Sequence, residues 1–108
     1  MTDSFAPRDP EAAEKAVALL KSLSHVGRLR ILCSLLDRSM NVSELAAELG
    51  EAQASVSQHL MRLRAEGLVR SQRYGKTVTY SLGRDDIEPL IAALRHAFCH
   101  DAGADRTS

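Results

Sequence analysis

A short capped helix with a fixed beginning and end constrains this chain more than any other feature. Residues 41–50 read NVSELAAELG, where Asn41 can cap the first turn and Glu44, three residues later, can bond back to it. Gly50 then supplies the left-handed residue that commonly ends a helix. The pattern predicts a short helix whose inward residues are Leu45, Ala46 and Leu49.

A second helix follows this capped helix after a tight turn. We expect a four-residue link from Gly50 to Gln53, then a helix from about Gln53 to Glu66, which Gly67 closes. Val56, Leu60 and Leu63 fall within one narrow arc of this helix at about 100° per residue. The spacing therefore predicts two helices packed together across a turn.

The next stretch, LVRSQRYGKTVTYSL, is typical of a β-hairpin. Val69–Arg73 and Thr77–Leu82 are rich in residues that favour strands, and Tyr74-Gly75-Lys76 forms the hinge between them. The hairpin carries several basic residues. Between Gln53 and Arg84 the chain has six lysines and arginines and one acid, although its net charge is zero. A basic block of this kind indicates a surface that faces a polyanion.

Three more helices complete the predicted order. Pro10 suits the first turn of one helix, and apolar residues recur at helical spacing up to Leu23. Another is expected from about Val26 to Asp37, with Cys33 on its apolar side. The last should begin after Asp85 or Asp86, run to about Cys99, and carry one apolar face: Ile87, Leu90, Ile91, Leu94 and Phe98.

The predicted fold is mainly α with a β-hairpin, in the order α-α-α-α-β-β-α, which describes a winged helix-turn-helix. At 108 residues the chain has the length of one domain. We place this domain at residues 10–100, between polar tails at 1–9 and 101–108 that we expect to be flexible.

The second helix of such a motif has the side chains needed to read DNA. Glutamine can bond adenine in a bidentate way, arginine can bond guanine, and serine can contact a base or a phosphate. Basic residues of a hairpin can grip phosphates, which supplies affinity more than sequence choice. The predicted DNA-contacting residues are Gln53, Ser55, Ser57, Gln58, His59, Arg62, Arg73 and Lys76.

The stretch NVSELAAELGEAQASVSQHLMRLRAEGLVRSQRYGKTVTYSL resembles the core of the ArsR/SmtB family of bacterial repressors. LKSLSHVGRLRIL is similar to that family's entry into its second helix. The resemblance covers roughly residues 11–100. It implies a homodimer joined through the first and last helices, which binds a double-stranded inverted-repeat operator and leaves it when an inducer binds.

The two metal-binding patterns familiar in this family are absent from the sequence. Where one type carries a cysteine pair, this chain reads Asn41-Val42-Ser43, and Asp86-Ile87-Glu88 lacks the histidine of the other type. His96 and His100 are four residues apart with no glutamate following. We therefore expect no metal site and no cofactor.

The two cysteines, Cys33 and Cys99, point to a different inducer. The pair resembles the dithiol branch of the family, the sulfide- and persulfide-responsive repressors and their biofilm-related relatives. This resemblance implies a polysulfide or disulfide bridge between Cys33 and Cys99 that forms with reactive sulfur species and releases DNA. The alternatives are general oxidative stress as the signal, or a Zn(II) or haem sensor that uses these cysteines with His96 or His100.

Other function classes fit less well. A thiol oxidoreductase, the distant alternative, would want a CxxC motif, which the sequence lacks, so we do not expect an enzyme. No apolar run approaches the roughly 20 residues of a membrane helix. The first 15 residues contain acids and prolines where a signal peptide needs a basic start and an apolar stretch, so we expect a cytoplasmic protein.

Overall fold

A computed structural model describes residues 9–98 of the chain. Five helices and three strands occur in this range: α1 (Pro10–Leu23), α2 (Val26–Leu35), β1 (Met40–Asn41), α3 (Val42–Leu49), α4 (Gln53–Ala65), β2 (Val69–Tyr74), β3 (Thr77–Leu82) and α5 (Ile87–Phe98). The predicted tails lie outside the described residues except for Asp9, whose carboxylate caps α1 by accepting from the Ala12 N–H at 3.2 Å. The predicted winged helix-turn-helix is confirmed.

The capping box at the start of α3 is present as predicted. The Asn41 side chain accepts from the Glu44 N–H at 2.8 Å, and the Glu44 carboxylate accepts from the Asn41 N–H at 2.9 Å. Gly50 ends the helix with a φ of 67°. That left-handed conformation is costly for residues with a Cβ atom. Both ends of α3 are therefore fixed by local interactions.

The turn between α3 and α4 is one residue shorter than predicted. Gln53 is already helical, so the link consists of Gly50, Glu51 and Ala52. The ends of two other helices also differ from the prediction. α2 ends at Leu35 instead of Asp37, and α4 ends at Ala65, with Glu66 as its cap. Helix ends fray, and sequence patterns locate them to within a turn at best.

The sheet has a strand that the sequence analysis missed. β1 pairs antiparallel with β3, placing Met40 opposite Tyr80, and β3 pairs in turn with β2, so the order is β1-β3-β2. Two residues are too few to show strand periodicity. The hairpin turn also proved tighter, because Tyr74 belongs to β2 and pairs with Thr77, leaving two residues in the turn. β1 anchors the hairpin to the start of α3.

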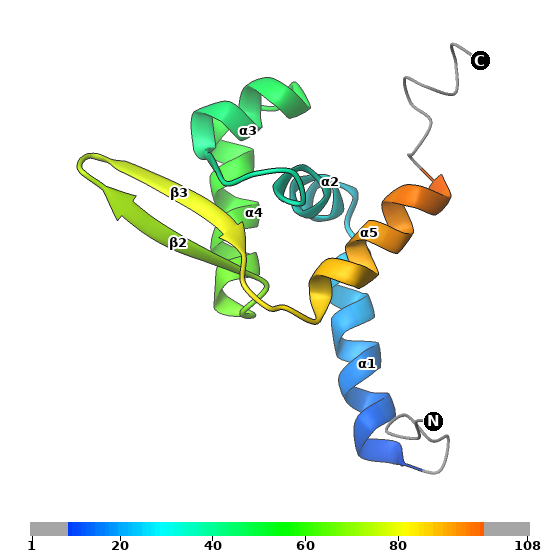
Figure 1. Cartoon of the computed structure of the whole chain (residues 1–108). Helices are drawn as coiled ribbons and strands as arrows, with labels where there is room; N and C mark the ends of the chain where they lie inside the picture. Colours follow the sequence, from blue (N-terminus) through cyan, green and yellow to red (C-terminus); the bar gives the residue numbers. More distant parts are fainter. Residues whose placement is uncertain (1–8, 99–108) are drawn as a thin grey trace.

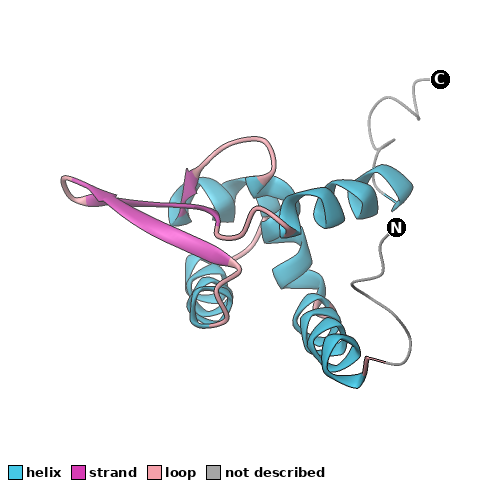
Figure 2. Cartoon of the chain, turned by 60° about the horizontal axis from the view of Figure 1, so that its bottom comes forward, coloured by secondary structure: helices cyan, strands magenta, loops and turns pink. Residues whose placement is uncertain are grey.

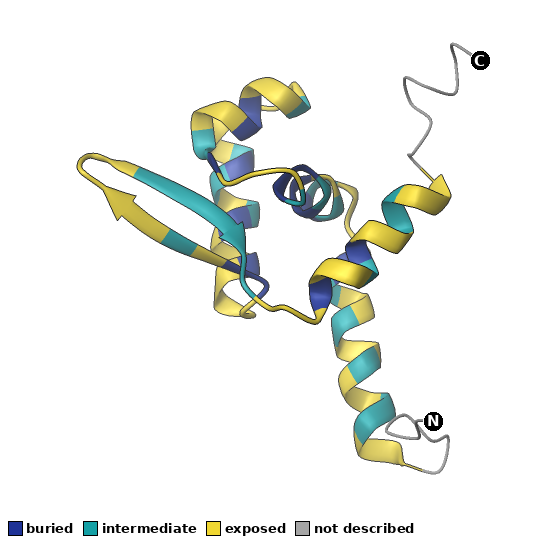
Figure 3. Cartoon of the chain, viewed as in Figure 1, coloured by how far each residue is buried: buried dark blue, intermediate teal, exposed yellow. Residues whose placement is uncertain are grey.

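The core lies where α2, α3 and α4 meet the base of the hairpin and the first turns of α5 (Figure 3). Its fully buried side chains include Ile31, Leu32, Met40, Leu45, Val56, Leu60, Leu63, Leu68, Ile87 and Ile91. The hairpin of β2 and β3 projects from this core (Figure 1). A view from below shows the hairpin on the side away from α1 and α5 (Figure 2).

Large apolar side chains remain exposed on α1 and α5. Val17, Leu20 and Phe98 are 48%, 56% and 78% exposed. The sequence predicts Phe98 on the apolar face of Ile87 and Ile91, but the packing of α5 on the core extends only as far as Leu94, and Phe98 beyond it is exposed. Among the described helices, none combines the length and the apolar character needed to cross a membrane.

The capping box provides a test of how the turn region is stabilised. Asn41→Ala should lower the free energy of unfolding by about 1 kcal/mol, because the Glu44 N–H loses its acceptor. Asn41→Asp keeps the acceptor and adds a negative charge at a helix N-terminus, so its stability should stay close to the parent's. Urea denaturation followed by circular dichroism measures both. Equal losses in the two variants would show that the cap is not the source of stability.

Candidate nucleic-acid interface and cysteine site

α4 buries one side and exposes the other. Val56, Leu60 and Leu63 are at most 1% exposed and pack into the core. On the opposite side of the helix, Gln58 and Met61 are exposed, and Met61 reaches 71% exposure. The buried residues thus hold Gln58 outward, on a rigid helix from which its amide can reach a base edge.

The predicted residues in the first turns of α4 differ in how far they are exposed. Gln53 is exposed at the first turn, and its Nε2 donates to the Ser43 hydroxyl at 3.3 Å. Ser55 and Ser57 are half-buried. The structure places these residues at the beginning of α4, where helix-turn-helix proteins make most of their base contacts.

His59 and Arg62 lie on the side of α4 that faces α2 and α1. The half-buried ring of His59 covers Gly27, so that a methyl group built on Gly27 would lie 2.5 Å from His59 Nε2. Arg62 is exposed but borders a hollow that α1 and α2 also line. Of the predicted α4 residues, Gln58 is therefore better placed than these two to enter a DNA groove.

The hairpin presents its basic residues to solvent. Arg73 lies in β2 and Lys76 in the turn, and both are exposed. Nearer the base of the hairpin, the Arg70 Nε donates to the Leu82 carbonyl at 3.1 Å. Within residues 9–98, neither Arg73 nor Lys76 takes part in an ion pair. Their charges are available to an external polyanion.

Cys33 lies on α2, half-buried against the core. An arginine of α5 reaches the same turn of α2, since the Arg95 Nη1 donates to the Cys33 carbonyl at 3.3 Å. The same guanidinium binds both carboxylate oxygens of Asp37, at 3.0 and 3.1 Å. This Arg95 clamp, defined by Arg95, Asp37 and the Cys33 carbonyl, joins the two helices that carry or lead to the cysteines.

The clamp lowers the pKa of the Asp37 carboxyl group. Its hydrogen bond from Arg95, helped by the charges of Arg95 and Arg38, holds the pKa of Asp37 below its ordinary value of 3.8, against a smaller opposing effect of burial. The pair leaves no signal in the sequence, because its two residues are 58 positions apart and share no local pattern. The chain has 14 lysines and arginines and 14 acids, so charge alone does not pair Arg95 with Asp37.

Three predicted residues remain: Cys99, His96 and His100. Cys99 and His100 lie outside the described residues, whereas His96 is described and exposed. Among residues 9–98, no group of three or more His, Cys, Asp or Glu side chains is arranged to hold a metal ion. The structure thus leaves the Cys33–Cys99 pairing as a prediction.

Comparison with known proteins gives consistent matches. Residues 25–71 match the sequence profile described as "Bacterial regulatory protein, arsR family". The transcriptional activator HlyU of Vibrio cholerae serotype O1 is 41% identical over 85 residues, 79% of each chain. The structure of reduced HlyU from Vibrio cholerae N16961 matches with a TM-score of 0.79 at 39% identity, covering 83% of this chain and 95% of that one. The transcriptional repressor BigR from Xylella fastidiosa matches with a TM-score of 0.79 at 35% identity, covering 85% and 91%.

The Arg95 clamp predicts a pH-dependent coupling between α5 and α2. Because the folded-state pKa of Asp37 is lowered, its contribution to stability is present above its ordinary pKa and is lost as the pH falls through the folded pKa. In a double-mutant cycle of Asp37→Asn and Arg95→Gln, we expect a coupling of at most about 1 kcal/mol at pH 7, because both side chains are partly exposed and solvent screens the pair.

This coupling should decline as the pH is lowered from about 5 to about 3. Urea unfolding of the four proteins at each pH measures it. A coupling that stays constant over this range would show that the Asp37 carboxylate does not bind Arg95 in solution.

Proposed function

The chain belongs to the ArsR family of bacterial regulatory proteins, and on that basis we propose that it is a dimeric repressor that releases its operator when reactive sulfur species link Cys33 to Cys99. Membership makes it a DNA-binding transcriptional regulator and not an enzyme. The mode of DNA reading, the dimer and the inducer are the parts that we propose.

DNA binding would use α4 and the hairpin together. α4 enters the major groove with Gln58 toward the base edges, while Arg73 and Lys76 contact phosphates beside it. The exposed position of Gln58, opposite the buried Val56 and Leu60, supports this orientation. In a two-fold dimer the two helices would read an inverted repeat with half-sites about one helical turn apart.

The exposed apolar side chains of α1 and α5 support the dimer. Val17 and Leu20 project from one helix and Phe98 from the other, and each is about half or more exposed in the single chain. Clusters of large exposed apolar residues are typical of interaction surfaces. A second copy of the chain would cover them through the first and last helices.

One observation carries the sensing proposal: α5 is already bound to the turn of α2 that holds Cys33. The Arg95 Nη1 donates to the Cys33 carbonyl, and Cys99 follows Arg95 by four residues in the sequence. A bridge between the thiols would therefore join two helices that are in contact in the structure. A related solved protein is described as reduced HlyU.

The chemistry requires two thiolates and a persulfide, RSSH. One cysteine thiolate attacks the outer sulfur of RSSH, taking that sulfur and releasing the thiol RSH. A second RSSH extends the chain by one more sulfur and releases a second RSH. The other cysteine thiolate then attacks the middle sulfur and expels hydrogen sulfide, which leaves a trisulfide bridge. Altogether two cysteine thiols and two RSSH give one trisulfide, two RSH and one H₂S.

Such a bridge would act on DNA binding through α2. α2 contacts α4 as well as α5, so a change in how α5 sits on α2 reaches the DNA-reading helix directly. In a dimer joined by α5, the same change alters the separation of the two α4 helices. Release requires a coupling of only about 1–3 kcal/mol.

The DNA-reading role predicts different effects for two substitutions. Gln58→Ala should cost about 1–3 kcal/mol on the operator and relax the choice of base at its position. Lys76→Ala should weaken specific and random DNA alike and reduce the slope of log K against log salt by about 1. Fluorescence anisotropy on operator and random duplexes over a salt series measures both. Equal loss on the two duplexes for Gln58→Ala would remove α4 from the reading role.

The two-thiol mechanism predicts that either cysteine is indispensable for release. Cys33→Ser and Cys99→Ser should bind the operator but fail to release it on treatment with a persulfide. Because a half-buried hydroxyl at Cys33 can cost about 1–3 kcal/mol of stability, Cys33→Ala serves as the matched variant that keeps an apolar side chain there.

Mass spectrometry should detect a Cys33–Cys99 bridge that has gained one sulfur and lost two hydrogens. A disulfide needs Cα atoms within about 7 Å, whereas a trisulfide spans a longer distance. If the Cα atoms of Cys33 and Cys99 are farther apart than this limit, persulfide, which forms the trisulfide, should release DNA better than peroxide, which forms the disulfide. Metal analysis of the reduced protein distinguishes the Zn(II) and haem alternatives. Release from a single-cysteine variant as efficient as from the parent would disprove the mechanism.

A further inference from the structure

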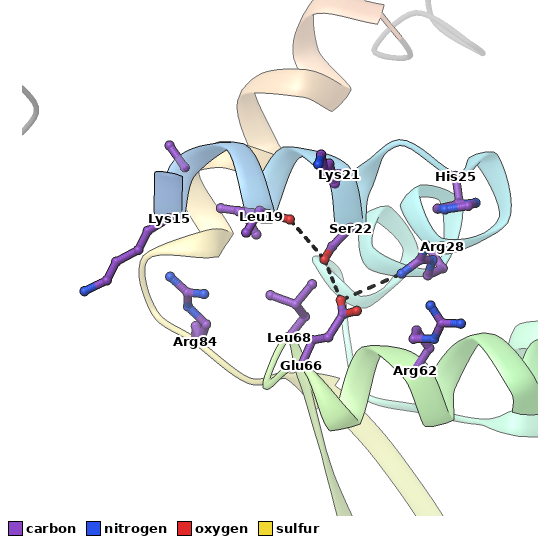
Figure 4. A pocket seen from close by; sticks show the side chains of 12 residues that line it. Lys15, Leu19, Lys21, Ser22, His25, Arg28, Arg62, Glu66, Leu68 and Arg84 are labelled. Carbon is purple, nitrogen blue, oxygen red and sulfur yellow. Dashed lines mark hydrogen bonds and ion pairs between the residues drawn. The ribbon is translucent and has the colours of Figure 1, made fainter. Parts of the chain in front are cut away.

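A basic hollow of about 790 Å³ lies between α1, the beginning of α2 and the end of α4. Its polar lining includes Lys21, Ser22, His25, Arg28, Arg62 and Glu66. Figure 4 shows Ser22, Arg28, Arg62 and Glu66 close together, with Leu19 and Leu68 beside them and with Lys21 and His25 at the edge. Among the described residues that line it, Cys33 is absent, so this hollow is separate from the part of the proposed sensor that the structure describes.

Positive charge exceeds negative charge in this hollow. Five lysines and arginines line it, against the single carboxylate of Glu66. Lys15 and Arg84 are paired with acids outside the lining, Glu11 and Asp86. Lys21 and Arg62 make no ion pair within residues 9–98. Two cationic side chains therefore face the hollow with their charge uncompensated by described residues.

Arg28 is a buried cation with one guanidinium nitrogen that makes no hydrogen bond within the described residues. The residue is only 4% exposed, and its Nη1 is buried without a hydrogen-bond partner in the described part of the chain. Glu66 Oε1 forms an ion pair with that nitrogen at 3.7 Å, a distance too long for a hydrogen bond, and the same oxygen already accepts from the Ser22 hydroxyl at 2.5 Å. Buried guanidinium groups normally have good hydrogen-bond acceptors. An added anion would supply them.

The beginning of α2 adds a second attraction for anions. His25 is the N-cap of this ten-residue helix, and its side chain makes no capping hydrogen bond. The free N–H groups and the dipole of such a helix end favour a negative group. Because His25 and Arg28 both line the hollow, this helix end borders the same space as the arginines.

The hollow also has an apolar part. Leu19 and Leu68 line it together with Ala16 and Ala18. We propose that the basic hollow binds a small organic anion, a carboxylate or phosphate monoester that carries an apolar group. Its negative group contacts Arg28, Arg62 and Lys21, and its apolar group rests on Leu19 and Leu68. Val17 and Leu20, the exposed apolar residues of α1, do not line the hollow.

Phenyl phosphate is a suitable probe, because it combines a dianion with an apolar ring. Titrated into the full-length reduced protein without DNA, it should shift the amide NMR signals of Ser22, Arg28 and Leu68. Inorganic phosphate lacks the ring and benzyl alcohol lacks the charge, so both should bind more weakly. If either binds as tightly as phenyl phosphate, the assignment to an organic anion is wrong.

Three variants test the geometry. Arg62→Gln should raise the dissociation constant for phenyl phosphate roughly tenfold, since one charged hydrogen bond is lost. Arg64→Gln removes the same charge from the same helix outside the hollow, and should change the constant less than about twofold.

Glu66→Gln removes the competing carboxylate and should tighten binding, a gain that a purely structural role for the hollow would not produce. Equal weakening by the two arginine variants, weaker binding in Glu66→Gln, or shifts confined to other residues would overturn the proposal.

Discussion

The packing of α4 against α2 and α3 is the interaction on which the rest of the structure depends. Val56, Leu60 and Leu63 are buried in the core, and the capped α3 and the three-residue turn set the angle at which α4 arrives. With that side fixed, Gln58 has only an outward position available. β1 then ties β3, and through it the whole hairpin, to the beginning of α3, so both proposed DNA-contacting elements share one rigid support.

The Arg95 clamp differs from this packing, because it is a partly exposed polar contact whose expected net contribution to stability is small. A weak contact between α5 and α2 suits a sensor better than a strong one. A covalent bridge nearby can change how the two helices sit only if the existing contact yields at a cost of a few kcal/mol. In the proposed sensor, the clamp would add to the buried contacts of Ile87 and Ile91 a polar link that can be broken.

Basic residues in this chain serve more than one surface. Arg73 and Lys76 on the hairpin face solvent, whereas Arg28 and Arg62 face the basic hollow between α1, α2 and α4. Both regions favour anions, but one is an open edge suited to a long polyanion and the other is a partly enclosed space with an apolar wall. The zero net charge of the chain conceals this arrangement, since acids elsewhere balance both groups.

The sequence by itself determined the order of the helices, the capping box at Asn41, the hairpin and the family, because each depends on contacts between residues close in the chain or on a contiguous motif. It did not reveal β1, which exists only because Met40 and Asn41 meet β3. Only the tertiary structure decided that His59 and Arg62 turn toward α2 and α1 while Gln58 turns outward, and that Arg95 reaches Asp37. A helical wheel gives the direction of a side chain relative to its own helix, but what lies in that direction depends on helices distant in sequence.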